Sequence, residues 1–196
     1  MTVNRIKEVA FSYFSEYGYE GTSLSMIAKE VGFKTPSLYA HFKSKESIFF
    51  SCLEDALESD LHFFQQNLKI SESKSAENIL YTLLINYEKR LLSEDISMFC
   101  LRTLYSPPHT FKTELFHQTN ERIADLGQLL RPIFEWEEKK GNLKDVTIED
   151  AIEAYLCLFD GLVIEFMYAG SERFQSRLKA SWRVFSQGLF KESSKL

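Results

Sequence analysis

Apolar residues recur every three to four positions near the start of the chain, which is the spacing of one face of a helix. The first such stripe ends at Gly18 and contains Ile6, Val9, Ala10, Tyr13, Phe14 and Tyr17. The second follows Thr22 and Ser23, either of which can cap a helix, and contains Leu24, Ile27, Ala28 and Val31. Gly32 comes next, where a chain leaving a helix often needs a positive φ, so the pattern predicts two helices and a turn.

A third, short helix is predicted directly after this turn. Thr35 suits the capping position and Pro36 the first helical position, because proline lacks the amide hydrogen that would be left unpaired there. Leu38 and Phe42 can pack back onto the second helix. The residues left facing outward are Thr35, Ser37, Tyr39, Ala40 and His41.

The rest of the chain also has helical patterns. Ser44 can cap a long helix from Lys45 toward residue 68, the polar run from Ser71 to Ser75 interrupts it, and consecutive prolines at 107 and 108 end a later helix. The remaining helices are predicted at about 79–91, 111–141, 147–170 and 172–190. The helix at 111–141 is expected to bend near Pro132 if it continues through that residue. No convincing strand pattern or internal repeat occurs, so an all-α fold is expected.

Composition and charge limit the class of protein and the way it could bind a nucleic acid. With 44% hydrophobic and 14% aromatic residues, the chain can form a packed interior and does not resemble a disordered protein. Residues 1–50 carry a net charge of plus one and the other 146 residues minus six, which gives the total of minus five. A nucleic-acid partner would therefore meet one local surface, where four lysines and one glutamate lie between residues 22 and 45.

The sequence has no clear targeting signal and no paired-cysteine motif. The first residues lack the apolar run of a signal peptide, and no stretch approaches about 18 uncharged apolar residues, so a cytoplasmic protein without a membrane partner is expected. Cys52, Cys100 and Cys157 form no Cys-x-x-Cys pair. Each is expected to be a small buried or half-buried residue, although a thiol sensor stays possible.

Two short segments carry a family resemblance. Gly-Tyr-Glu-Gly-Thr-Ser joins the first two helices, and Leu-Tyr-Ala-His-Phe-Lys-Ser-Lys-Glu closes the unit. Over residues 5 to about 50 the chain resembles the TetR family of bacterial transcriptional regulators. Lys34 departs from the serine or threonine cap of many members, and Thr35 is expected to replace that cap. The resemblance implies a three-helix, homeodomain-like head at residues 1–47 and a helical effector-binding and dimerisation body at 48–196.

The resemblance also implies a function for the exposed residues of the head. A repressor would place one recognition helix per subunit in successive major grooves of a palindromic DNA operator, with half-sites roughly 34 Å apart. Base contacts are expected from Thr35, Ser37 and Ala40, and phosphate contacts from Tyr39, His41, Lys45 and Thr22 or Ser23. The complete predicted DNA-binding set is Thr22, Ser23, Lys34, Thr35, Pro36, Ser37, Tyr39, Ala40, His41 and Lys45.

A homodimer is expected from the last two helices. Residues 155–168 are apolar except for Asp160 and Glu165, and a helix so hydrophobic must be covered on more than one side. In the TetR family the last two helices of each subunit form a four-helix dimer interface, which agrees with this expectation. The predicted interface residues are Asp160, Gly161, Ile164, Tyr168, Leu178, Trp182 and Phe185.

The resemblance further implies a cavity in the body for a small-molecule effector. Candidate lining residues are aromatic or polar within otherwise apolar helices: His62, Phe63, Phe99, Arg102, Tyr105, Arg122, Trp136, Tyr155 and Glu165. Most such residues serve in packing or ion pairs. Glu165 in a cavity would favour a cationic ligand and Arg102 or Arg122 an anionic one, and no cofactor is predicted.

Two other functions are alternatives to an effector-controlled DNA-binding repressor. The Glu114-x-x-His117 spacing occurs in di-iron helical enzymes, but no second pair is found, and no phosphate loop, nucleophile elbow or zinc motif is present. A metal site at His109, Glu114 and His117 is therefore not expected, nor is an enzyme. The other alternative is a DNA-binding protein of the same fold without an effector, in which the body would lack an apolar cavity.

Overall fold

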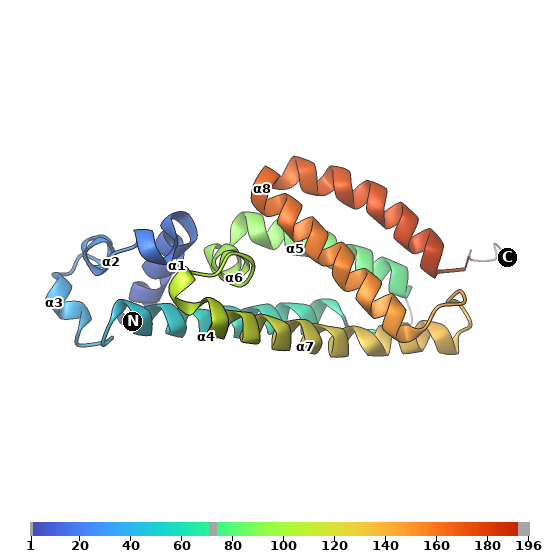
Figure 1. Ribbon diagram of the computed structural model, residues 1–196, viewed down its shortest axis with the longest axis horizontal. Coiled ribbons are helices and arrows are strands. Elements are labelled where there is room, and N and C mark those ends of the chain that lie inside the picture. The colour runs from blue at the N-terminus through green and yellow to red at the C-terminus, as the bar shows by residue number, and fades with distance from the viewer. Residues whose placement is uncertain (1, 71–73, 192–196) are drawn as a thin grey trace. The chain divides into compact units, whose positions relative to one another are not determined.

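The computed structural model describes residues 2–70 and 74–191, which are helical with no strand beyond an isolated bridge between Leu143 and Phe190. The all-α prediction is confirmed. The elements are α1 (Thr2–Gly21), α2 (Leu24–Val31), α3 (Thr35–Leu38), α4 (Lys45–Asn67), α5 (Ala76–Ser93), α6 (Asp95–Tyr105), the 3-10 turn η1 (His109–Phe111), α7 (Lys112–Lys139) and α8 (Ile148–Leu189) (Figure 1). No helix in the described part of the chain is long and apolar enough to span a membrane.

The chain divides into two units, which share α4, α5 and α7. The first comprises residues up to 62 and 91–116, and the second residues 63–90 and 117 onward. The predicted domain boundary at residue 47 falls inside the first unit, because α4 continues beyond it and α6 joins the same unit. The helix-turn-helix segment therefore belongs to a unit larger than the first 47 residues.

Aromatic side chains fill the core of the first unit. Phe14 of α1, Phe49 of α4 and Phe99 of α6 are buried, with ring centroids 5.4 to 5.9 Å apart. Ile27 of α2 and Leu38 of α3 belong to the same buried cluster. The short helices α2 and α3 are thus anchored by apolar side chains, which fixes the faces that remain exposed.

The core of the second unit contains Phe64, Tyr87 and Phe159, with ring centroids 4.8 to 5.7 Å apart. Helix α8 covers this unit with two arms that meet at Gly170, where φ is 73°. Glycine adopts this conformation without the strain that a Cβ would bring. The arms run back along each other, and Tyr155 contacts Phe185 with 5.9 Å between ring centroids (Figure 1).

Most predicted helix limits are confirmed. The Ser44 hydroxyl accepts the Ser47 amide at 3.1 Å, and the Thr147 hydroxyl accepts the Asp150 amide at 3.0 Å. The break between α5 and α6 at Glu94 was missed, because no glycine or proline marks it. Helix α7 continues through Pro132. Part of the predicted interruption at 71–75 lies outside the described residues.

Candidate nucleic-acid interface

The turn between α2 and α3 is built by local hydrogen bonds. At the start of α2 the Ser23 hydroxyl accepts the Met26 amide at 3.2 Å, which satisfies one of the free donors of the first turn. At its end Gly32 takes the left-handed conformation, and the Phe33 amide returns to the Ala28 carbonyl at 2.7 Å. These bonds hold the chain in the turn that leads into α3.

Helix α3 begins one residue earlier than predicted. Lys34 holds the capping position without a side-chain hydrogen bond, Thr35 is already helical, and Pro36 is second. The prediction that Thr35 caps α3 is therefore wrong. Proline is still tolerated at the second position, because amides of the first helical turn have no intrahelical partner.

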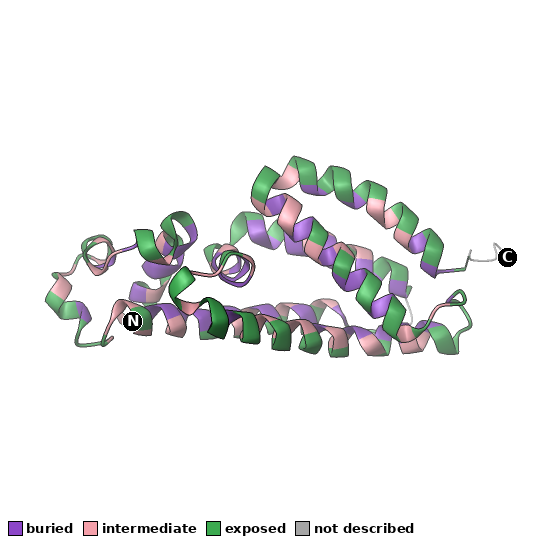
Figure 2. Ribbon diagram, viewed as in Figure 1, coloured by how far each residue is buried: buried purple, intermediate pink, exposed green. Residues whose placement is uncertain are grey.

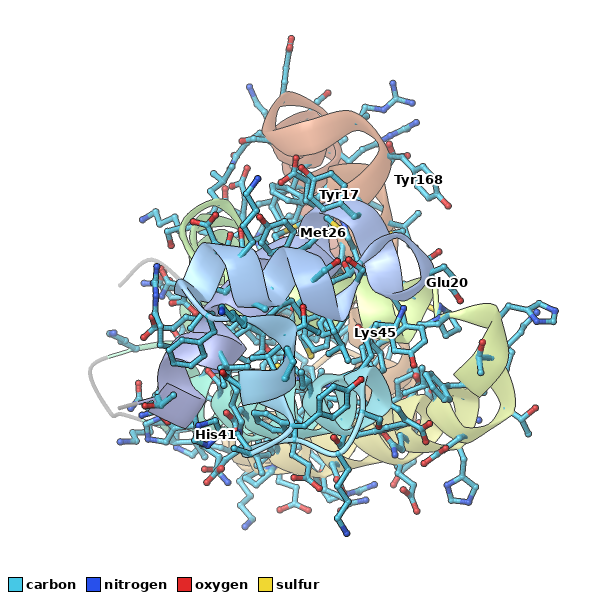
Figure 3. All side chains as sticks on the ribbon, turned by 90° about the vertical axis from the view of Figure 1, so that its left-hand side faces the viewer. Tyr17, Glu20, Met26, His41, Lys45 and Tyr168 are labelled. Atoms are coloured by element: carbon cyan, nitrogen blue, oxygen red, sulfur yellow. The ribbon has the colours of Figure 1, made fainter. Side chains whose placement is uncertain are left out.

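The residues predicted to face outward from α3 and from the turn after it are mostly exposed. Leu38 is buried and holds the helix against α2, whereas Tyr39 is 57% exposed and Thr35 is half-buried. Figure 2 shows α3 mainly exposed, and Figure 3 shows His41 at the edge of the same end of the protein. The predicted residues that are exposed here are Lys34, Pro36, Ser37, Tyr39, Ala40 and His41.

Thr22 does not fit its predicted contact with phosphate. Its side chain is 1% exposed, and its hydroxyl lies 2.8 Å from the Gly18 carbonyl oxygen and 3.1 Å from that of Tyr13. A hydroxyl has only one proton to donate, and these carbonyls receive it. Thr22 therefore stabilises the end of α1, and Ser23 alone of the predicted pair caps α2.

Lys45 is also engaged inside the protein. Its ammonium donates to the carbonyl oxygens of Tyr19 at 2.6 Å and Thr22 at 2.9 Å, and it lies 4.1 Å from the centre of the Tyr19 ring. Partial burial lowers the pKa of Lys45, while the Glu20 carboxylate acts in the opposite direction. The predicted free phosphate-binding lysine is thus tied to backbone, because the fold brings residues 19–22 to the start of α4.

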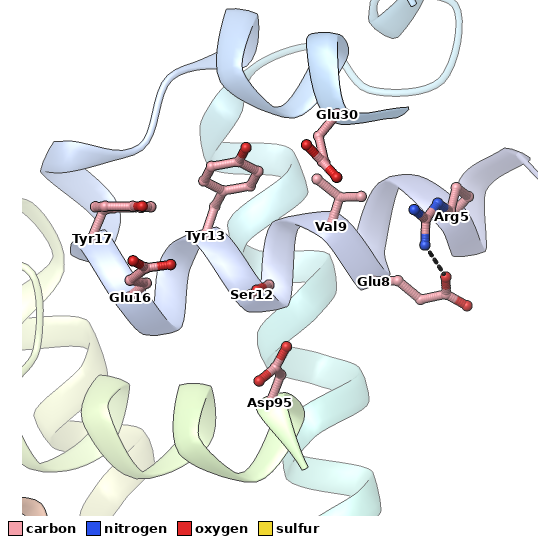
Figure 4. A pocket seen from close by; sticks show the side chains of 9 residues that line it. All are labelled: Arg5, Glu8, Val9, Ser12, Tyr13, Glu16, Tyr17, Glu30 and Asp95. Atoms are coloured by element: carbon pink, nitrogen blue, oxygen red, sulfur yellow. Dashed lines mark hydrogen bonds and ion pairs between the residues drawn. The ribbon is translucent and has the colours of Figure 1, made fainter. Parts of the chain in front are cut away.

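An open groove of about 460 Å³ lies along α1, next to Glu30 of α2 and Asp95 of α6 (Figure 4). Its charged residues are one cation and four carboxylates: Arg5, Glu8, Glu16, Glu30 and Asp95. Arg5 is paired with Glu8 at 3.2 Å. The net charge of minus three repels phosphate, so this side of the unit is unsuited to DNA contact.

The predicted effector residues are divided between the two units. In the first unit Phe99 is buried among Phe11, Phe14 and Phe49, which leaves its ring no surface for a ligand. Arg102 donates to the Ser15 carbonyl. His62, also in this unit, is exposed, and Tyr105 is half-buried.

The candidates in the second unit also have structural partners. Tyr155 is completely buried, and Glu165 pairs with Arg173 at 2.9 Å and Arg177 at 3.4 Å. In this structure Tyr155 has no open surface for a ligand to contact. The other candidates of this unit, Phe63, Arg122 and Trp136, are half-buried and each contacts a neighbour. The Phe63 and Tyr87 ring centroids lie 5.7 Å apart, and the Arg122 guanidinium lies 5.6 Å from the centroid of the Phe64 ring. The Lys140 ammonium lies 3.0 Å from the centroid of the Trp136 ring.

The predicted dimer residues differ in how far each is exposed. Leu178 is completely buried, so its predicted place at an interface is corrected to the core of its own unit. Trp182 and Phe185 are half-buried and contact each other, with Tyr81 lying 5.2 Å from Trp182. Tyr168 is 79% exposed, Gly161 is exposed, and Asp160 and Ile164 are half-buried. Val184, which is not in the predicted set, is also exposed.

The three cysteines differ in exposure. Cys52 and Cys100 are buried as predicted, but Cys157 is exposed on α8. Burial raises the pKa of Cys52 to about 12, which keeps its thiol protonated at neutral pH. Within residues 2–70 and 74–191, no group of three or more His, Cys, Asp or Glu side chains is arranged to hold a metal ion.

Known proteins share both the head and the fold. Residues 6–52 match the family model described as bacterial regulatory proteins, tetR family. The biofilm operon icaADBC HTH-type negative transcriptional regulator IcaR of Staphylococcus aureus is 33% identical over 129 residues, or 65% of this chain and 64% of IcaR. The matched segment thus spans slightly less than two thirds of that regulator.

Solved structures extend the likeness to nearly the whole chain. A TetR transcriptional regulator from Chloroflexus aurantiacus has a TM-score of 0.75 at 16% identity, covering 96% of each chain. FadR from Bacillus subtilis, solved in complex with stearoyl-CoA, has a TM-score of 0.71 at 19% identity, covering 94% of this chain and 98% of FadR. Residues 6–52 thus match the TetR family head, the similarity to IcaR extends beyond that head, and the chain shares the fold of solved TetR regulators.

Proposed function

We propose that the chain is a cytoplasmic, homodimeric transcriptional repressor without enzymatic activity, which binds a palindromic DNA operator through α3 and leaves it when a small-molecule effector binds. The exposed face of α3 carries this proposal, because Leu38 anchors a helix whose polar and small side chains face outward. Similarity to IcaR, a negative regulator, supports repression, and the stearoyl-CoA complex of FadR supports an effector.

Within this function, small and hydroxyl side chains of α3 and of the turn after it would contact base edges in the major groove. Ser37 and Thr35 offer hydroxyl groups, and Ala40 can contact a thymine methyl. Tyr39, His41, Lys34 and Ser23 would hold the phosphate backbone and set the register. The acidic groove along α1 would face away from DNA.

A dimer would join two such heads. Tyr168 and Val184 expose large apolar surface on the two arms of α8, and a Cβ added at Gly161 would meet open space. A second copy of the chain would cover these residues. Tyr168→Glu is expected to give monomers in sedimentation and to lose cooperative operator binding; a variant that remains dimeric would exclude Tyr168 from the interface.

The test of DNA binding is a footprint on the DNA that flanks the chain's own gene. We expect a protected palindrome with half-site centres roughly 34 Å apart, as two recognition helices on one face of B-DNA require. Ala40→Glu should abolish protection by placing a carboxylate against the base edges. Ala124→Glu, the same change at an exposed position of α7, should retain it. No protection by the folded dimer on genomic fragments at low salt would overturn the proposal.

Effector coupling has its own test. If an effector releases DNA by favouring a conformation that binds DNA poorly, the operator must weaken effector binding by the same factor, typically about 5- to 150-fold. Fatty acyl-CoA is the first class to measure, as suggested by FadR. Equal effector affinity with and without operator would refute release by this coupling and favour an effector-independent regulator.

A further inference from the structure

Lys45 lies where three parts of the DNA-binding head meet. It is the first residue of α4, Tyr19 follows the break in α1 at Gly18, and Thr22 directly precedes the residue that caps α2. Figure 3 shows the Lys45 side chain among these elements, on the side that also carries Glu20. One side chain therefore reaches the backbone on both sides of the connection between α1 and α2.

The bonds that Lys45 makes are of a strong type. Its ammonium donates to the carbonyl oxygens of Tyr19 and Thr22 at 2.6 and 2.9 Å, and hydrogen bonds from a charged donor are about twice as strong as neutral ones. The carbonyls at the end of a helix carry partial negative charge, which favours a cation there. The face of the Tyr19 ring, 4.1 Å away, adds a cation-π contact.

The carbonyl partners are themselves fixed in place. The Tyr19 ring packs against Phe49 at 5.0 Å and Phe111 at 4.9 Å, and Phe49 lies one turn after Lys45 on α4. The Thr22 hydroxyl is held by the Gly18 carbonyl at 2.8 Å. The ammonium thus connects two rigid points, so a displacement of the first turn of α4 would be passed directly to the backbone ahead of α2.

We propose that Lys45 is a positioning residue: it sets the orientation of α2 and α3 through the carbonyls of Tyr19 and Thr22 and does not bind DNA phosphate. The proposal rests on the DNA-binding function proposed above, which it deepens by naming the contact through which α4 controls the recognition helix. Lys43 offers a matched control, because it is an exposed lysine two residues away.

The first experiment needs no DNA. In Lys45→Met, amide hydrogen exchange over residues 19–31 should become at least about tenfold faster than in the wild type, because one charged hydrogen bond accounts for such a factor and two are lost. Lys43→Met should leave this exchange unchanged. Unchanged exchange in Lys45→Met would overturn the proposal, and this result does not depend on whether the chain binds an operator.

The second experiment measures operator affinity against salt concentration on a footprinted duplex. Lys45→Met should bind more weakly with the same salt slope, whereas Lys43→Met is expected to reduce the slope if it contacts phosphate. Loss of one phosphate contact lowers the slope by about 0.9, so such a decrease in Lys45→Met would overturn the proposal. A wild-type chain that binds no operator would instead refute the proposed function.

If Lys45→Met does not fold, the wild-type chain decides the question by nitrogen-15 NMR of its lysine ammonium groups. The Lys45 ammonium should show couplings to the Tyr19 and Thr22 carbonyls, and they should persist when the duplex is added. Loss of these couplings on DNA binding, or a new coupling to phosphorus, would overturn the proposal.

Discussion

The hydroxyl of Tyr155 donates a hydrogen bond to the backbone carbonyl oxygen of Leu80, 2.9 Å away, although Tyr155 is completely buried. The bond joins the first arm of α8 to α5 within the second unit. Burial raises the pKa of Tyr155 well above its usual value of 10.0, so the hydroxyl remains a donor at neutral pH. A residue expected to touch a ligand instead joins two helices.

This bond can be tested with Tyr155→Phe, which removes the hydroxyl and keeps the ring. The variant should lower the free energy of unfolding by about 1 kcal/mol, the usual net contribution of one hydrogen bond. Urea denaturation would measure it, with Tyr39→Phe as the control at an exposed tyrosine. Equal stability of Tyr155→Phe and wild type would show that the bond contributes nothing.

Thr22→Val should also destabilise the protein by about 1 kcal/mol, because its hydroxyl satisfies a carbonyl at the end of α1. Valine has nearly the same shape, so the core should remain filled. Ser25→Ala, at an exposed position three residues later, should change the unfolding free energy much less. If Thr22→Val is as stable as the wild type but binds the operator more weakly, the result would support the phosphate contact that the sequence predicts for Thr22.

The break in α8 gives a pair of opposite predictions. Gly170→Ala places a Cβ on a residue with a φ of 73° and should cost about 1 kcal/mol or more. Gly188→Ala, in the same helix and with no atom within 4 Å of the added Cβ, should instead stabilise the chain by up to about 1 kcal/mol. Thermal unfolding would separate them, and a shift of the same sign in both variants would contradict the backbone argument.

Thiol reactivity should distinguish the three cysteines. In Cys157→Ser only the buried Cys52 and Cys100 remain, and no thiol should react rapidly with a disulfide reagent at pH 9. The pKa of Cys52 is about 12, so its reactive thiolate stays rare until the pH approaches that value. Both thiols should react after denaturation. Rapid reaction in the folded variant would show that one of these sites opens readily.

The raised pKa of Cys52 also predicts that the protein loses stability at alkaline pH. Above its ordinary value of 9.0 the Cys52 thiol ionises in the unfolded chain, while the folded chain keeps it protonated until about 12. Its contribution is therefore complete below pH 9 and lost as the pH rises to 12. Cys52→Ala should lose less of its unfolding free energy over this range, which urea titrations at several pH values would measure. An identical decline in both chains would show that Cys52 does not contribute.

The sequence by itself determined most of the helices, the turn after α2, the cap at Ser44 and the helix start at Thr147, and it narrowed the cap of α2 to Thr22 or Ser23. These features depend on φ preferences and on hydrogen bonds between residues at most a few positions apart, so nearby residues suffice to predict them. The family resemblance had the same source, because its motifs lie within the local α1–α4 segment. The break at Glu94 escaped prediction because its local sequence lacks a strong signal.

Tertiary structure alone decided which side chains are available. Thr22 and Lys45 looked like free surface groups in the local pattern, but Lys45 meets the Thr22 carbonyl 23 positions away. Phe99, Tyr155 and Leu178 had the residue types expected at binding surfaces, yet each is buried by residues far along the chain. Periodicity shows which residues share a helix face, whereas burial and the pairing of polar groups depend on what packs against that face.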